Sequence, residues 1–248
     1  MAASFLNGFL FRPAQKSGFG SLTMNRFLSC IAVLVISGHA AAGLDDITHA
    51  EAVRGLRQAL TDGSAAAVAK LGVENGFFAN PRVKIPLPPS LQRIERGLRA
   101  FGMTREADEL VLSMNRAAEA AVPEAKQLLT DAVKKMSVQD AKGILTGGDT
   151  AATEYFQRTT RSQLGQRFLP IVKKATDKAG LAQQYNALAG QGAALGLVKE
   201  EQASIERYVT QKALDGLYYV IGEQEKAFRK DPVGASSAIV RKVFGALR

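Results

Sequence analysis

The residues best suited to chemistry lie in one stretch of the sequence, Met114–Arg158. Asn115 and Glu119 are spaced so that a helix places them on one face, with Arg116 beside them. Further polar residues follow at the starts of the next predicted helices: Asp140, Asp149, Thr153, Glu154 and Tyr155. Paired carboxylates can exchange protons with a substrate or bind Ca²⁺ or Mg²⁺ through their oxygens. We therefore take this polar set as the candidate ligand-binding site or polar core.

A purely structural role for these residues is the alternative, and the sequence favours it. Asp140 and Asp149 are placed to cap helix starts. Arg116 and Arg158 are placed to form salt bridges with the carboxylates, and Glu154 lies one helical turn before Arg158. The D-x-D-x-D-G calcium loop is absent, so the sequence predicts no metal site and leaves any catalytic residue unknown.

Two glycine-rich stretches could hold the phosphate of a cofactor, and neither fits well. Gly190–Gly196 has its third glycine one residue late for a dinucleotide loop, and no strand is predicted before it. Gly147-Gly148 precedes a predicted helix, whose N–H groups favour anions. Asp149 places a negative charge at the same point, and no G-K-[ST] follows. The sequence therefore predicts no cofactor.

Composition excludes several kinds of catalysis and partner. The only cysteine, Cys30, and one of the two histidines, His39, lie in the N-terminal stretch. Without that stretch the chain has no thiol for a disulfide, a zinc site or a nucleophile, and His49 is its one histidine. The net charge of +9 is interspersed along the chain, which is typical of a solvated helix surface. No RNA-recognition motif is present, so we predict no nucleic-acid partner.

The N-terminus has the pattern of a secretory signal peptide. Arg26 precedes the apolar run Phe27–Ser37, and the small residues Ala40–Ala42 follow. The apolar run is shorter than the about 20 residues that a transmembrane helix needs. We therefore expect export to the periplasm, cleavage after Ala42 and no transmembrane helix in the mature chain.

The domain organisation follows from that segment. Residues 1–42 are the predicted signal peptide, of which 1–23 are interpreted as an over-long gene start before Met24. Residues 43–248 are expected to form one domain. Because alanine is abundant and aromatic residues are sparse, the composition favours helix over sheet. We predict an all-α fold, a single irregular bundle of about nine helices with an extended Pro-rich apolar arm.

The arm is predicted at residues 75–89. Its prolines cannot continue a helix, since proline lacks the N–H group and biases the preceding residue to extended geometry. Val83, Ile85 and Leu87 alternate with other residues, so we expect them to pack against the helical body. A short strand and a PxxP-type ligand motif are the alternatives.

Three expectations concern individual helices. Thr61–Gly63 should separate two helices, the second capped by Ser64, and Pro170 should kink or restart another. Ile205 begins the strongest helix, in which Gly216 predicts the close approach of another helix. Glu223, Glu225 and Arg229 are assigned to the solvated face of that helix. Tyr218 and Tyr219 are assigned to core packing, with the edge of a pocket as the alternative.

Five motifs in order resemble one known family. They are Asn80–Pro88, Met114–Glu119, Asp140–Gly148, Ala151–Phe156 and Ala213–Tyr218. Together they resemble the domain of unknown function 4197 family, and the resemblance covers nearly all of Leu44–Arg248. It implies an exported, periplasmic, helical protein of Gram-negative-type bacteria, and it brings no known activity and no established site. Tyr218 and Tyr219 stand where phenylalanine is expected at one position or the other.

The first functional hypothesis is a non-enzymatic periplasmic domain that binds an envelope protein or a small ligand. Its site is expected where the face bearing Asn115 and Glu119 meets the helix starts at Asp140 and Asp149–Tyr155. The alternative is a carboxylate-based hydrolase or other acid/base enzyme using Glu119, Asp140, Asp149 or Glu154. A structural envelope protein is the third hypothesis.

Overall fold

The computed structural model describes residues 48–89, 92, 104–178, 180, 204–231 and 238–245. The chain divides into two units, Met1–Ala40 and Ala41–Arg248, and all the described residues belong to the second. The regular structure in these ranges is helical, without a strand, which confirms the all-α prediction.

The described ranges contain fewer helices than the about nine predicted. The elements are α1 (His49–Leu71), α3 (Thr104–Ala121), the 3₁₀ turn η2 (Val122–Glu124), α4 (Ala125–Lys135), α5 (Val138–Thr146), α6 (Ala151–Asp177), α8 (Ile205–Lys230) and α9 (Ala238–Gly245). Apolar residues at helical spacing also predict helices over Leu91–Phe101 and Tyr185–Leu195, and these lie mostly or wholly outside the described residues. Two predicted breaks are also absent, which merges helices that the sequence separates.

The first absent break is at Thr61–Gly63, where α1 continues without interruption. The Ser64 hydroxyl donates to the Thr61 carbonyl (3.1 Å) and therefore does not cap a second helix. Gly63 faces α8, because a Cβ there would lie 3.1 Å from the ring of Phe228. The glycine that reads as a helix breaker is thus a site of close packing.

The second absent break is at Pro170, which lies inside α6. Pro170 is exposed, so the carbonyl that loses its hydrogen-bond partner can be reached by water. Phe168 and Val172, on either side of it, are fully buried. Packing of both flanks against the bundle holds the helix through the proline.

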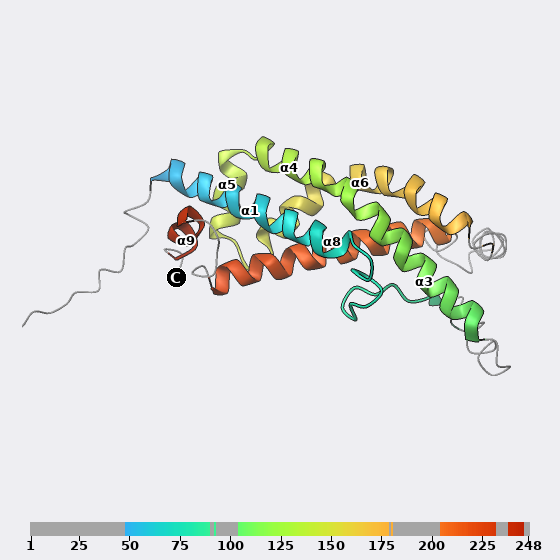
Figure 1. The fold of residues 1–248 in the computed structure, drawn as a ribbon. Coiled ribbons are helices and arrows are strands. Elements are labelled where there is room, and N and C mark those ends of the chain that lie inside the picture. Colours follow the sequence, from blue (N-terminus) through green and yellow to red (C-terminus); the bar gives the residue numbers. More distant parts are fainter. Residues whose placement is uncertain are drawn as a thin grey trace, which may run out of the picture. The chain divides into compact units, whose positions relative to one another are not determined.

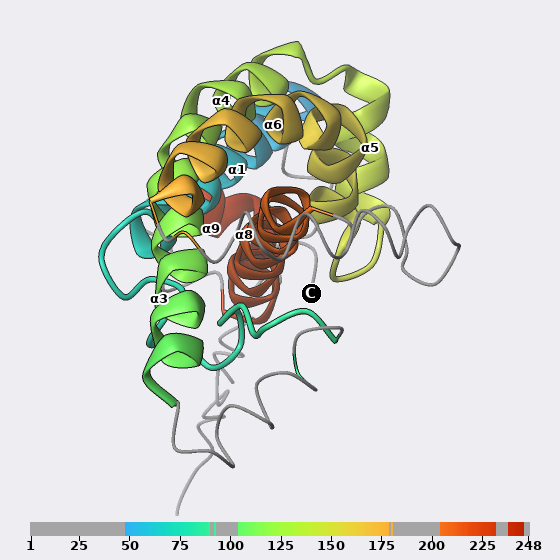
Figure 2. The ribbon, with the colours of Figure 1, turned by 90° about the vertical axis from the view of Figure 1, so that its right-hand side faces the viewer.

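Helix α8 is the centre of the arrangement. It packs against α6, α1 and α3, and Figure 2 looks nearly along its axis. Large fully buried side chains from these helices fill the core, among them Leu56, Met114, Phe156, Phe168 and Leu164. Helix α9 packs on α1. The backbone that follows α1, residues 72–88, runs beside α3 and α8 (Figure 1).

That loop, residues 72–88, is called the anchored segment below. It contains turns and irregular backbone without a helix. Phe77, Ile85 and Leu87 are at most 3% exposed. Gly216 of α8 makes room for it, since a Cβ there would lie 2.6 Å from the Phe77 ring. The close approach predicted at Gly216 therefore comes from this loop, not from a helix.

Candidate functional site

Asn115 holds the anchored segment by its backbone. Its side chain is fully buried on α3. Oδ1 accepts from the Ile85 N–H (2.8 Å), while Nδ2 donates to the Ile85 carbonyl (2.9 Å) and to the Val111 carbonyl (2.8 Å). A single amide thus pairs both polar groups of one buried residue, much as a neighbouring strand does.

Glu119 holds the same segment one helical turn later. It is 5% exposed, and Oε1 accepts from the N–H groups of Phe77 and Phe78 (both 3.0 Å). Oε2 accepts from Arg116 Nη1 at 2.6 Å. Arg116 also donates through Nη2 to Glu74 (3.0 Å). Both oxygens of this carboxylate are therefore occupied by groups of the domain itself.

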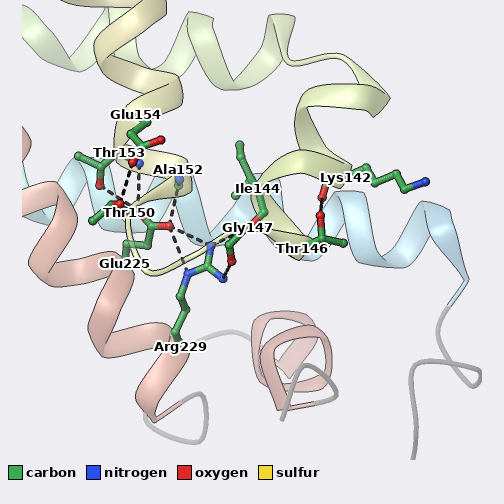
Figure 3. A network of polar contacts seen from close by, with 10 residues as sticks. All are labelled: Lys142, Ile144, Thr146, Gly147, Thr150, Ala152, Thr153, Glu154, Glu225 and Arg229. Atoms are coloured by element: carbon green, nitrogen blue, oxygen red, sulfur yellow. Dashed lines mark hydrogen bonds and ion pairs between the residues drawn. The ribbon is translucent and has the colours of Figure 1, made fainter.

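A second buried carboxylate, Glu225, caps helix α6 from α8 (Figure 3). Its oxygens accept from the N–H groups of Ala152 and Thr153 and from the Thr153 hydroxyl, each at 2.9 Å. Arg229 donates to Glu225 from Nε (3.2 Å) and Nη2 (2.9 Å). Since the first N–H groups of a helix have no partner within the helix, Glu225 supplies the cap that α6 otherwise lacks.

Arg229 caps the end of α5, on the other side of the corner between α5 and α6. Its Nη2 donates to the Ile144 carbonyl (2.8 Å) at the end of α5, and Nη1 donates to the Gly147 carbonyl (3.4 Å). The Glu225 and Arg229 side chains are only 5% and 14% exposed, so their assignment to a solvated face is wrong. The sequence contains one indication that Glu225 is buried, because it lies four residues after Ile221 and so falls on the buried stripe of α8.

Asp140 caps α5. It forms a capping box with Ser137, whose hydroxyl donates to it at 2.6 Å, and it pairs with Arg158 at 3.3 Å. The hydrogen bonds from Ser137, aided by Arg158, lower the pKa of Asp140 from its ordinary value of 3.8. Tyr155 lies beside this pair, with the Arg158 guanidinium 5.6 Å from its ring. Its hydroxyl donates to the Ala132 carbonyl (2.7 Å), and burial raises its pKa.

The remaining predicted residues lie at the start of α6. Thr153 bonds to Glu225, while Glu154 accepts from the Thr150 hydroxyl (2.8 Å). Arg158 pairs with Asp140, so the structure gives Glu154 a different partner from the one predicted. Asp149 is exposed in the turn before α6.

These residues do not gather at one point. Asn115, Arg116 and Glu119 lie under the anchored segment, which meets α8 at Gly216. Thr153 meets α8 at Glu225, about 14 Å further along the helix axis at 1.5 Å per residue. Asp140 and Tyr155 form a third group around Arg158. A binding role for any of them stays a prediction.

The anchored segment also forms one wall of an open groove beside α8, here called the Lys84 groove. It has a volume of about 490 Å³. Its lining includes Arg82, Lys84, Pro86, Tyr208, Lys212, Asp215 and Tyr219. Asp215, the one acid among the described lining residues, pairs with Arg161 at 2.6 Å and with Lys212 at 3.7 Å. The described lining therefore holds three cations, Arg82, Lys84 and Lys212, against one acid that Arg161 and Lys212 share.

Two tyrosines give the Lys84 groove aromatic walls. The Tyr208 hydroxyl donates to the Pro86 carbonyl at 3.1 Å, which fixes its ring against the anchored segment. Tyr219 is 38% exposed, so the prediction of core packing is correct for Tyr218, which is 1% exposed, and wrong for its neighbour. Sequence reasoning missed this groove because its cations come from two segments that are far apart along the chain.

Comparison with known proteins identifies the family. The family model described as "Protein of unknown function (DUF4197)" matches residues 46–245, which is most of the chain and includes every candidate residue above. The chain belongs to the DUF4197 family. No curated protein and no solved structure matches it.

Two findings concern the helices and the ionisable side chains in the described part of this DUF4197 protein. None of the described helices has the length and apolar content needed to cross a bilayer. The described residues also contain no group of three or more histidine, cysteine or acidic side chains placed to hold a metal ion.

Proposed function

We propose that this DUF4197 protein is a non-enzymatic, periplasmic domain that binds a small anionic ligand in the Lys84 groove. The supporting observation is the set of three cations, Arg82, Lys84 and Lys212, on a groove of about 490 Å³. That volume lies within the range of small-ligand sites. Because water-exposed charges interact weakly, several cations in one concave surface are needed to hold an anion.

The anchoring of the wall supports binding in a preformed site. Asn115 and Glu119 fix the backbone of residues 77–85 by buried hydrogen bonds, so Lys84 and Arg82 start from a backbone that is already ordered. Preorganisation lowers the entropy cost of binding. Tyr208 and Tyr219 add apolar, amphipathic walls on which a ring or chain of the ligand can pack.

The positions of the carboxylates argue for binding over acid/base catalysis. A general acid or base must reach the substrate proton within hydrogen-bond distance. Both oxygens of Glu119 and of Glu225 are instead taken by backbone N–H groups and an arginine. Asp140, with its lowered pKa, is engaged with Ser137 and Arg158. These contacts stabilise the fold and occupy the oxygens that a general acid or base would need for the substrate.

The proposal is tested by ligand-induced thermal shift and calorimetry. Citrate and inorganic phosphate serve as anionic probes, and glucose as the neutral one. We expect citrate to raise the unfolding temperature of the wild type, and the Lys84→Gln/Lys212→Gln variant to lose that rise. The matched control is Lys135→Gln/Lys142→Gln, which removes the same charge from exposed positions on other helices. Equal loss in both variants, or no response of the wild type to any probe, contradicts the proposal.

Export is the second part of the proposal. Its support is the apolar run Phe27–Ser37 after Arg26 and the small residues Ala40–Ala42. The expected result is that cell fractionation recovers the protein in the periplasm and that N-terminal sequencing of it begins at Gly43. Recovery in the cytoplasm with the N-terminal residues intact contradicts it.

A further inference from the structure

A second groove lies between α6 and α8 and shares no lining residue with the Lys84 groove. Its volume is about 420 Å³, and its lining includes Arg161, Leu169, Arg207, Thr210 and Leu214. We propose that this groove, called the Thr210 groove, binds the carboxylate of a short aliphatic acid. The proposal does not depend on the function assigned to the Lys84 groove.

The first observation is the Thr210 hydroxyl. Thr210 is 7% exposed, and its Oγ1 is buried without a hydrogen-bond partner in the described part of the chain. Other buried threonines here bond to the carbonyl one turn earlier, as Thr160 does to Phe156 (2.6 Å) and Thr176 to Val172 (3.1 Å). A buried hydroxyl without a hydrogen bond is destabilising, and rotation of the Thr210 side chain about χ1 toward the groove would let an acceptor atom of a ligand satisfy it.

The second observation is the presence of arginine N–H donors. Arg161 and Arg207 line the groove, and no acidic residue is among its described lining residues. Arg161 donates through Nη2 to Asp215 (2.6 Å). Because a guanidinium carries five N–H donors, that ion pair leaves Arg161 able to donate to a second acid. A carboxylate offers the acceptor that Thr210 lacks, and it matches the planar geometry of arginine.

The third observation is the apolar floor. Leu214 and the 36% exposed Leu169 line the same groove as the hydroxyl. The space around Gly165 is open, since a Cβ there would meet only the Leu214 side chain, at 3.8 Å. A short hydrocarbon chain can therefore lie over the leucines while its carboxylate meets Arg161 and a Thr210 hydroxyl that has turned toward the groove. This combination selects an aliphatic carboxylate over a purely ionic ligand.

The test is an NMR titration of the ¹⁵N-labelled protein at constant ionic strength. Sodium butyrate is the probe, and butyramide is the neutral control of the same shape. We expect butyrate to shift the amide signals of Thr210, Leu214 and Gly165, and butyramide to leave them unchanged. Equal shifts with both probes, or none with butyrate, overturn the proposal.

Substitution of the hydroxyl separates a binding role from a structural one. Thr210→Val removes the unsatisfied hydroxyl at nearly constant volume, so we expect an unfolding temperature at least equal to the wild type and butyrate affinity weakened about fivefold or more. Thr210→Ser keeps the hydroxyl and should keep the affinity, and it also serves if the valine variant folds poorly. Thr130→Val, on α4, is the matched control. Wild-type affinity in folded Thr210→Val, or equal loss in Thr210→Ser, overturns the proposal.

Discussion

Replacement of Glu225 by alanine should be among the most damaging single changes in α8. The carboxylate accepts five hydrogen bonds, three from Ala152 and Thr153 and two from Arg229. Its removal leaves the first N–H groups of α6 uncapped. It also leaves Arg229, whose side chain is 14% exposed, without its ion-pair partner. Loss of one partner of a buried ion pair costs about 3–5 kcal/mol. We expect the free energy of unfolding to fall by that amount.

The chain supplies a matched control on the same helix. Glu223 pairs with Lys226 at 3.3 Å, and both side chains are about half exposed, at 48% and 51%. Such a surface pair contributes about 0–1 kcal/mol, so Glu223→Ala should be nearly neutral. Urea unfolding followed by circular dichroism gives both values. The local effect is read from hydrogen exchange, which should accelerate at the amides of Ala152 and Thr153 in Glu225→Ala alone.

A double-variant cycle isolates the pair itself. When Glu225→Ala is combined with Arg229→Ala, no buried charge is left unpaired, so the double variant should lose less stability than the sum of the single variants. Free energies of unfolding of Glu225→Ala and Glu223→Ala within about 1 kcal/mol of each other would refute a capping role for Glu225. Wild-type exchange protection at the start of α6 in Glu225→Ala would refute it as well.

Three further predictions follow. Gly143→Ala should raise the free energy of unfolding by up to about 1 kcal/mol, because a Cβ at this exposed helical position meets nothing within 4 Å; thermal unfolding checks it. Gly216→Ala should instead lower stability by about 1–3 kcal/mol, because its Cβ would lie 2.6 Å from the Phe77 ring, and urea unfolding should detect the loss. For Asp140, a folded pKa below the ordinary value means that its stabilisation is present above pH 3.8 and is lost as pH falls through the folded pKa. The stability difference between wild type and Asp140→Asn should therefore be full at neutral pH and shrink in acid titrations; a constant difference contradicts it.

Apolar periodicity predicts the helices of this protein well, for a physical reason. Met114, Ala118 and Ala121 recur at helical spacing because one face of α3 is buried, and the pattern records that burial directly. The same logic fails at Gly63 and Pro170. Local propensity predicts a break at both residues. The helix continues at Gly63 because it packs closely against α8, and at Pro170 because the residues on either side are buried.

The polar contacts are harder to predict, because their partners lie far away in the sequence. The sequence around Asn115 does not predict that its amide pairs with Ile85, and the sequence around Ala152 does not predict a cap supplied by Glu225. The residue types of the candidate site are visible in the sequence, but their distribution over three places depends on tertiary packing. A carboxylate on a buried stripe, as at Glu225, is the local clue that such a partner must exist.

The Glu225–Arg229 pair that joins α5 to α6 has a consequence for the order of events in folding. Its two capping residues, Glu225 and Arg229, are more than 70 positions downstream of the backbone groups they satisfy. A chain that emerges N-terminus first therefore completes α5 and α6 before their caps exist. Closure of this corner must then be a late step, governed by the arrival of α8. A nascent chain that stops before Glu225 retains the sequence of both helices but lacks the side chains that join them.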